Sequence, residues 1–180
     1  MVDVAKNLLA IKAQLPEGVE LTAVSKFHPD EYITAAYNVG QRIFGESHEQ
    51  ELARKAASLP KDIHWHFIGH LQTNKVKYIA PYISMIESVD SIRLLREIEK
   101  QGARCGRRIR VLLELHIAEE ATKYGLTPDD CRSLLADGEW QQMEHVEICG
   151  LMMMASHTDD HDQIAREMDT AHSFFDEVRG

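Results

Sequence analysis

The organisation of this chain is clearest in residues 42–68, RIFGESHEQELARKAASLPKDIHWHFI. The two ends of this stretch, 42–46 and 63–68, are short apolar runs that favour strands. Residues 49–59, which lie between them, are predicted to form a helix. The stretch therefore predicts two parallel strands joined by a helical crossover.

The same alternation continues through the rest of the chain. Further strands are predicted over residues 20–26, 84–89, 108–116 and 146–153. Further helices are predicted over residues 4–15, from Pro29 to Gly40, around 73–79, from Asp90 or Ser91 to 101, from Pro128 onward, and over 160–178. Strict alternation of this kind predicts an α/β fold whose parallel strands are joined by right-handed crossovers.

Two architectures fit six such units. One is an open doubly wound sheet, and the other is part of an eight-fold (β/α)8 barrel of the TIM type. A complete barrel typically takes ~250 residues, whereas this chain has 180 and stops after a helix, where a seventh strand would begin. We expect a TIM-barrel type fold that lacks its last strands. Because no linker or low-complexity stretch is visible, residues 1–180 are expected to form a single domain.

The composition is that of a folded, acidic globular protein. Apolar residues make up 44% of the chain and charged residues 27%, which argues against disorder, collagen and coiled coil. Lys and Arg number 20 against 29 Asp and Glu, so the formal net charge is −9 at pH 7. A field of this sign repels phosphate backbones, so we expect no nucleic-acid partner. One small phosphorylated ligand held by local donors remains compatible with it.

Cysteine usage and hydropathy indicate a cytoplasmic protein. The three cysteines, Cys105, Cys131 and Cys149, are widely spaced and form no C-x-x-C motif, which is typical of a reducing compartment. No apolar run approaches the ~20 residues that cross a bilayer. The N-terminus also lacks the long apolar segment of a secretory signal. We therefore expect no membrane partner.

Lys26 is the residue that draws attention at the strand ends, where ligands bind in both candidate architectures. It closes an apolar strand, and the chain continues into Phe27-His28-Pro29 rather than into a charged run. A lysine at a barrel mouth can lose hydration and supply the neutral amine that attacks an aldehyde. The alternative is a solvated lysine whose stem lies along apolar surface.

Ten histidines raise the alternative of a metal-dependent hydrolase. The candidate spacings are His64-x-His66, His66-x-x-x-His70 and His157-x-x-x-His161. Only the last fits one face of a helix, and it lacks the glutamate of the H-E-x-x-H motif. Zinc also needs a third protein ligand, which no motif here specifies, so structural or surface roles are favoured.

Two other segments have a functional and a structural interpretation. Residues 73–77, TNKVK, are basic at a predicted helix start, where they could receive a phosphate or simply lie in solvent. Residues 152–154, MMM, fit the packed interior of a barrel better than a cofactor site. Neither G-x-G-x-x-G nor G-K-[ST] occurs, so dinucleotide and P-loop sites have no motif support.

Six runs of residues, taken together and in this order, resemble the pyridoxal 5′-phosphate (PLP) homeostasis protein family. Members of that family are stand-alone relatives of the barrel domain of alanine racemase. The resemblance covers nearly the whole chain, and the His-Phe-Ile-Gly-His-Leu-Gln-x-Asn-Lys string in its third run is long and highly specific. The runs are Ala23-Val-Ser-Lys26, Gly40-Gln-Arg-Ile-Phe-Gly-Glu46, His64-Trp-His-Phe-Ile-Gly-His-Leu-Gln-Thr-Asn-Lys75, Ser88-Val-Asp-Ser91, Lys123-Tyr-Gly-Leu126 and Gly150-Leu-Met152.

The resemblance implies a barrel that holds PLP as a Schiff base on Lys26. The further cofactor-binding residues expected with it are Ser47, His66, Asn74 and Met152, with no catalytic residue and no metal. The implied role is a PLP carrier in vitamin B6 and amino-acid homeostasis. The alternative is a PLP-dependent racemase or lyase. Racemisation needs an acid or base on each face of the substrate, and alanine racemase draws one of them from a second domain, for which this chain has no room.

The sequence departs from the family's pattern in two places. The family usually has Asn-Tyr after Phe-Gly-Glu, where this chain has Ser47-His48. The family's phosphate site comes from a C-terminal segment with a Ser-Met-Gly-Met-Ser-like run and a Gly-Ser-Thr-x-Val-Arg stretch, and this sequence contains neither. We therefore expect weak phosphate affinity. A monomer is the expected state.

Overall fold

Six parallel strands form the centre of the computed structural model, which describes residues 2–117 and 124–179. They are β1 (Ala23–Val24), β2 (Ile43–Glu46), β3 (His64–Phe67), β4 (Met85–Val89), β5 (Ile109–Leu115) and β6 (Val146–Met153). Each strand pairs in parallel with the next one in the chain, so the sheet order is β1-β2-β3-β4-β5-β6.

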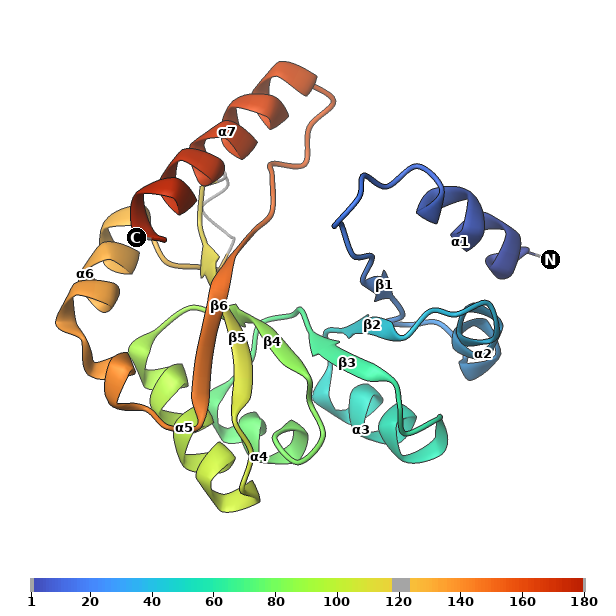
Figure 1. Cartoon of the computed structure of the whole chain (residues 1–180), viewed down its shortest axis with the longest axis horizontal. Helices are drawn as coiled ribbons and strands as arrows, with labels where there is room; N and C mark the ends of the chain where they lie inside the picture. The colour runs from blue at the N-terminus through green and yellow to red at the C-terminus, as the bar shows by residue number, and fades with distance from the viewer. Residues whose placement is uncertain (1, 118–123, 180) are drawn as a thin grey trace.

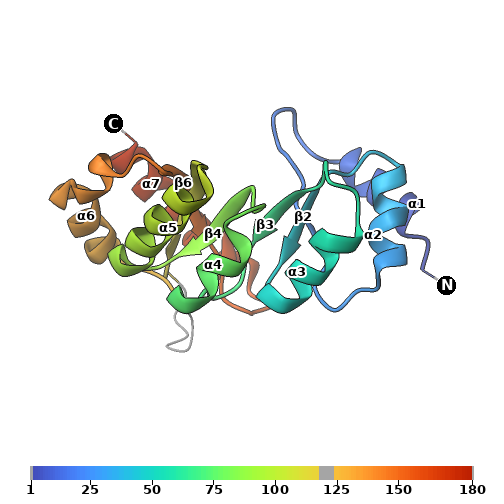
Figure 2. The same ribbon diagram turned by 90° about the horizontal axis from the view of Figure 1, so that it is seen from below.

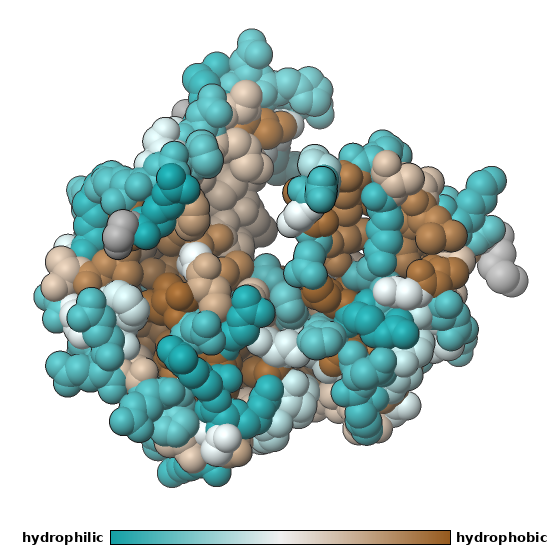
Figure 3. Space-filling view, viewed as in Figure 1, coloured by the Kyte–Doolittle hydropathy of each residue, from teal (hydrophilic) through white to brown (hydrophobic). Residues whose placement is uncertain are grey.

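This sequential order distinguishes between the two predicted architectures. A doubly wound sheet reverses direction at a switch point, whereas the strands of a (β/α)-barrel follow one another around the sheet. The barrel type of fold is therefore confirmed. The described strands form a curved, open sheet whose edges are β1 and β6 (Figure 1). Figure 3 shows a deep hollow between the arm that carries β6 and α7 and the arm that carries β1.

The helices alternate with the strands as predicted. They are α1 (Val4–Lys12), α2 (Asp30–Asn38), α3 (Glu49–Ser58), α4 (Val76–Ile79), α5 (Ile92–Cys105), α6 (Pro128–Asp137) and α7 (His161–Val178), with short 3-10 turns η1 (Thr73–Lys75) and η2 (Glu139–Gln142). Ser91 caps α5 as expected, because its side chain accepts a hydrogen bond from the Leu94 N–H. Figure 2 shows α3, α4 and α5 lying along the outside of the strands. Among the described residues, no helix combines the length and the apolar character needed to cross a membrane.

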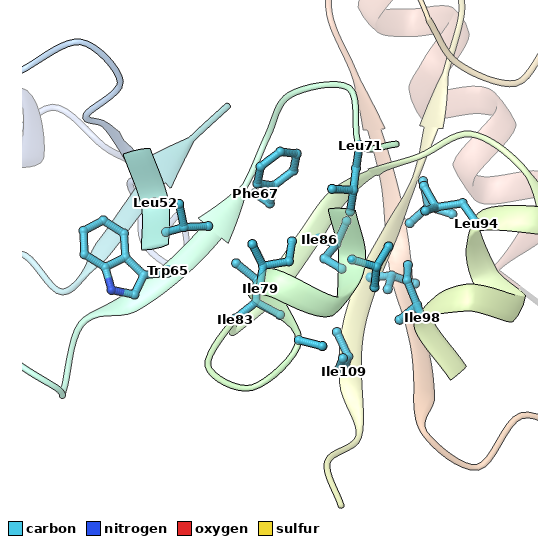
Figure 4. Packing of buried hydrophobic residues seen from close by; sticks show 14 of the residues in the cluster. Leu52, Trp65, Phe67, Leu71, Ile79, Ile83, Ile86, Leu94, Ile98 and Ile109 are labelled. Atoms are coloured by element: carbon cyan, nitrogen blue, oxygen red, sulfur yellow. The ribbon is translucent and has the colours of Figure 1, made fainter. Parts of the chain in front are cut away.

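The hydrophobic core lies between the sheet and these helices. Alternate strand residues such as Trp65, Phe67 and Ile86 point toward Leu52 of α3 and Ile98 of α5, and all are at most 3% exposed (Figure 4). Burying each such side chain stabilises the fold by about 1.5–3 kcal/mol.

The other strand residues form what we call the inner face, on the side away from the helices. Successive side chains of a strand point to opposite faces, so His66 lies on the inner face because Trp65 and Phe67 lie in the core. By the same rule and the strand register, Gly45 of β2 and Val24 of β1 share this face. The inner face is turned toward the hollow in Figure 3, and the carboxyl ends of the parallel strands lie along one rim of this face.

The first strand is shorter than predicted. Residues 20–26 were expected to be extended, but β1 covers only Ala23–Val24. At the amino end, the Leu21 carbonyl oxygen accepts a hydrogen bond from the Gln41 side chain. At the carboxyl end, the chain enters a turn in which the His28 N–H donates to the Ser25 carbonyl oxygen at 3.1 Å. This turn contains Lys26, so the lysine follows the strand instead of ending it.

Candidate functional site

Lys26 lies at the carboxyl end of β1, in the turn that follows the strand. The Ser25 N–H donates to the Gly45 carbonyl oxygen, so the ladder with β2 extends to Ser25. Ser25 is 4% exposed, and its hydroxyl donates to Glu46 Oε1 at 2.6 Å on the core side. Val24, the residue before Ser25, lies on the inner face, and Lys26 follows Ser25 as the first residue inside the turn.

The Lys26 amine is half-buried and makes no hydrogen bond or ion pair with any residue that the structure describes. Lys55 and Lys75 differ in being paired: Lys55 contacts two carboxylates, and the Lys75 amine lies 2.5 Å from Glu49 Oε1. Lys12 of α1 is also half-buried without such a partner in the described part of the chain, but it does not lie at the carboxyl end of a strand. A half-buried amine without a carboxylate partner keeps its lone pair available to a ligand once it is deprotonated.

Two other predicted site residues lie on, or directly after, the two strands next to β1. Gly45 is opposite Val24 and His66 is opposite Gly45, so Ser47 lies two residues beyond Gly45 in the same direction as Lys26. The Nδ1 atom of His66 is 2.5 Å from Glu87 Oε1, and their side chains are 13% and 16% exposed. The structure therefore places Lys26 and Ser47 directly after two adjacent strands, β1 and β2, and His66 on the inner face of the next strand, β3.

The remaining two predicted residues lie farther along the sheet or outside it. Met152 is opposite Glu114 in the β5–β6 ladder, at the other edge of the sheet from Lys26. Asn74 is exposed in η1, beyond the end of β3, and is not grouped with the inner-face residues. The motif lysine Lys123 lies outside the described residues.

Sequence reasoning missed two acidic residues of the inner face. Glu87 is paired with His66, as described above. Glu114 is 4% exposed, and its Oε2 atom has no hydrogen-bond partner among the described residues. Burial raises the pKa of the Glu114 carboxyl, and the charge of Asp90 raises it further. The available signal was strand alternation, because Glu114 and Arg110 occupy one parity of an otherwise apolar strand.

The histidines do not assemble into a metal centre in the part of the chain that the structure describes. No group of three His, Cys, Asp or Glu residues there has the geometry to hold a metal ion. His66 is paired with Glu87, and His70 lies 3.4 Å from Asp90 while its ring stacks on Tyr124 at 3.8 Å. The metal-dependent hydrolase alternative gains no support from these residues.

Sequence comparison relates the whole chain to known proteins. The family model for the N-terminal domain of alanine racemase matches residues 2–180. A pyridoxal phosphate homeostasis protein of Schizosaccharomyces pombe is 37% identical over 140 residues, which cover 77% of this chain and 58% of that protein. A protein of the same name from Helicobacter pylori is 33% identical over 163 residues, which cover 89% of this chain and 73% of that protein. The chain thus spans less than two thirds of the first of these relatives.

Solved structures agree with the sequence comparison. PipY of Synechococcus elongatus, solved with PLP bound, superposes with a TM-score of 0.88 at 33% identity and covers 98% of this chain and 82% of PipY. Alanine racemase of Streptomyces lavendulae superposes with a TM-score of 0.81 at 18% identity over 98% of this chain and 47% of the racemase. The second likeness shows a shared fold alone.

Proposed function

Because this chain belongs to the alanine racemase N-terminal domain family, and within it to the pyridoxal phosphate homeostasis proteins, we propose that it holds pyridoxal 5′-phosphate through Lys26 and releases it again. The observation that carries the proposal is the place of Lys26: the residue is half-buried, follows β1 at its carboxyl end, and its amine has no partner among the described residues. PipY, which is similar over 98% of this chain, was solved with PLP bound.

The groups beside Lys26 fit an aldehyde cofactor. When bound, PLP supplies an aldehyde carbon with which a neutral amine forms a reversible carbon–nitrogen double bond, releasing one water. Lys26 provides that amine. Ser47 offers a hydroxyl and His66 an imidazole on the same face, and the Glu87 carboxylate fixes the orientation of the imidazole through Nδ1. Their proposed role is to orient the ligand beside Lys26.

The phosphate group is expected to be held weakly by these residues. Glu87 adds an acidic group to the inner face, and a carboxylate there repels a phosphate dianion. Asn74, which is exposed beyond β3, and Met152, which lies on β6 at the other edge of the sheet, are proposed as further lining residues on the family resemblance alone. Release of the ligand by hydrolysis or by exchange with another amine follows from such weak retention.

Carrier function is favoured over racemisation or elimination by the composition of the site. A racemase needs a proton donor and an acceptor on opposite faces of the substrate, and Lys26 supplies one such group. Among the described acidic residues of the inner face, Glu87 is engaged by His66, and Glu114 lies on β5, three strands beyond β2, so we assign neither as the second group. Incubation of the PLP-loaded protein with L-alanine should therefore exchange the bound amine without accumulating D-alanine or pyruvate. Sustained product formation would instead favour the enzyme.

We further propose that the protein acts in the cytoplasm as a monomer. All three cysteines are free thiols, as expected in a reducing compartment. Sedimentation of the purified protein at several concentrations tests the oligomeric state directly.

The binding proposal is tested by titration with PLP, followed by visible absorbance. Wild-type protein should show a saturable band from cofactor bound to an amine, and Lys26→Ala should lose it. Lys61→Ala is the matched control, because the Lys61 amine bonds the Ala56 and Ala57 carbonyl oxygens at the end of α3. Retention of the band in Lys26→Ala would refute the assignment of Lys26.

A further inference from the structure

A buried ion network lies on the core side of β1 and β2, opposite the inner face. The Lys55 side chain is fully buried, and its ammonium donates three hydrogen bonds of 2.7 Å. The acceptors are the Ser25 carbonyl oxygen, Glu46 Oε1 and Glu51 Oε1. An ammonium has three protons, so these partners satisfy it completely.

The network reaches the backbone on both sides of Lys26. Lys55 binds the carbonyl of Ser25, the residue before Lys26. Glu51 accepts a hydrogen bond of 2.9 Å from the N–H of Phe27, the residue after it. The Lys55–Glu51 ion pair, at 2.7 Å, connects the two contacts. A single i,i+4 pair of α3 therefore bridges the peptide units that flank Lys26.

The backbone held by this bridge is in an uncommon conformation. Phe27 has a φ of 64°, and it is the only non-glycine residue with positive φ in the described part of the chain. Such a value at the third residue of a turn is typical of type II turns, where glycine is usual. A residue with a side chain costs about 1–2 kcal/mol there. The hydrogen bond from the Phe27 N–H to Glu51 helps to hold this conformation.

We propose that Lys55 and Glu51 act as positioning residues for Lys26. This inference rests on the proposed function of Lys26 as the PLP-binding lysine. By fixing the Ser25 carbonyl and the Phe27 N–H, the pair sets the direction in which the Lys26 side chain leaves the turn and keeps its amine on the inner face. Both residues lie on the other side of the strand from that amine, so they orient it without pairing with it.

The charges of the network match this role. Partial burial raises the pKa of Glu51, but hydrogen bonds from Lys55 and from the Phe27 N–H outweigh it and hold that pKa below its usual value. Glu51 is therefore ionised at neutral pH and accepts from both donors. A buried ion pair adds little net stability compared with apolar residues of the same size. The contacts of Lys55 and Glu51 with the turn therefore suggest that the pair positions the turn as well as stabilising the fold.

The test uses Glu51→Ala, because the Glu51 side chain is 20% exposed and its loss leaves Lys55 paired with Glu46. Wild-type and variant proteins are mixed with PLP, quenched with borohydride at successive times, and analysed by peptide mass spectrometry. Glu49→Ala is the matched control, because it removes a carboxylate of the same helix that pairs with Lys75 and does not contact the turn. Hydrogen exchange of the Phe27 amide is measured in parallel.

Glu51→Ala should slow labelling of Lys26 by about tenfold, as expected from lost orientation, while labelling of exposed lysines is unchanged. Phe27 amide exchange should accelerate, and Glu51→Gln, which keeps an acceptor oxygen, should restore most of the labelling rate. If Lys26 in Glu51→Ala is labelled at the wild-type rate, the positioning role is wrong. Absence of Lys26 labelling in the wild type would instead refute the proposed function.

Discussion

Gly69 approaches Ser47 so closely that a Cβ atom added to Gly69 would lie 2.6 Å from the Ser47 Cβ and 2.8 Å from the Ser47 carbonyl oxygen. The contact joins the ends of β2 and β3 next to two of the proposed cofactor-binding residues, Ser47 and His66. A side chain at position 69 would therefore force the backbone of one strand end to move.

Gly69→Ala should lower the free energy of unfolding by about 1–3 kcal/mol, because the added methyl overpacks a backbone contact. It should also weaken PLP binding by displacing Ser47. Gly106→Ala is the control, because Gly106 has a φ of +62° with open space around it and precedes β5 at the other end of the sheet. That change should cost about 1 kcal/mol and leave binding unaltered. Urea unfolding and PLP titration measure the two effects, and normal binding by Gly69→Ala would contradict the expectation.

Glu114 should make stability depend on pH. Its pKa is raised in the folded state, so its contribution to stability is fully present below the unfolded pKa and is lost as pH rises through the folded pKa. The glutamine side chain of Glu114→Gln does not titrate, so the variant does not lose this stability as the pH rises. Relative to wild type, the variant should gain on the order of 1 kcal/mol between acidic and mildly alkaline pH, the usual cost of a poorly satisfied buried polar group. Urea unfolding across this pH range gives the difference, and parallel curves for the two proteins would rule out the effect.

Lys55→Met should be strongly destabilising. It leaves the fully buried Glu46 carboxylate without its cation, and an uncompensated buried charge of this kind costs about 3–5 kcal/mol. The double variant Lys55→Met with Glu46→Leu removes both charges and should recover most of that loss. Thermal or urea unfolding of the two variants tests this, and equal instability of the single and double variants would show that the charge is not the cause.

Phe27→Gly should be more stable than Phe27→Ala by about 1 kcal/mol or slightly less. The Phe27 side chain is 75% exposed, so both variants lose similar packing, and they differ chiefly in the cost of a positive φ. Both variants lose the contact between the Phe27 and His48 rings, so this contact does not affect the difference between their free energies of unfolding. An alanine variant as stable as the glycine variant would mean that the turn relaxes.

Much of the architecture could be predicted because it depends on local patterns. The apolar runs and helix caps predicted all six strands and the helices between them. The choice between a doubly wound sheet and a barrel came only with the sequential strand order seen in the structure. The main local error was β1, which was expected over seven residues and forms two. Its end is set by the turn at Ser25, whose positive φ at Phe27 has no glycine to signal it.

The site could be predicted only in part. The place of Lys26 after an apolar strand left a solvated lysine as the alternative, and the family resemblance made it the candidate and added Ser47 and His66, which stay predictions. Lys55 was not identifiable, because a lysine in the charged helix α3 normally lies in solvent. That its amine reaches the Ser25 carbonyl, 30 residues away, depends on how α3 packs beneath the strands. Such contacts belong to tertiary structure and leave no local pattern.

The central claim is that the Lys26 amine is the attachment point of PLP. Borohydride reduction of the PLP-loaded protein, followed by proteolysis and peptide mass mapping, tests it most directly. We predict that the cofactor-derived mass is found on the single peptide that contains Lys26. Its appearance on Lys75, on Lys123 or across surface lysines such as Lys61, with Lys26 unmodified, would contradict the account.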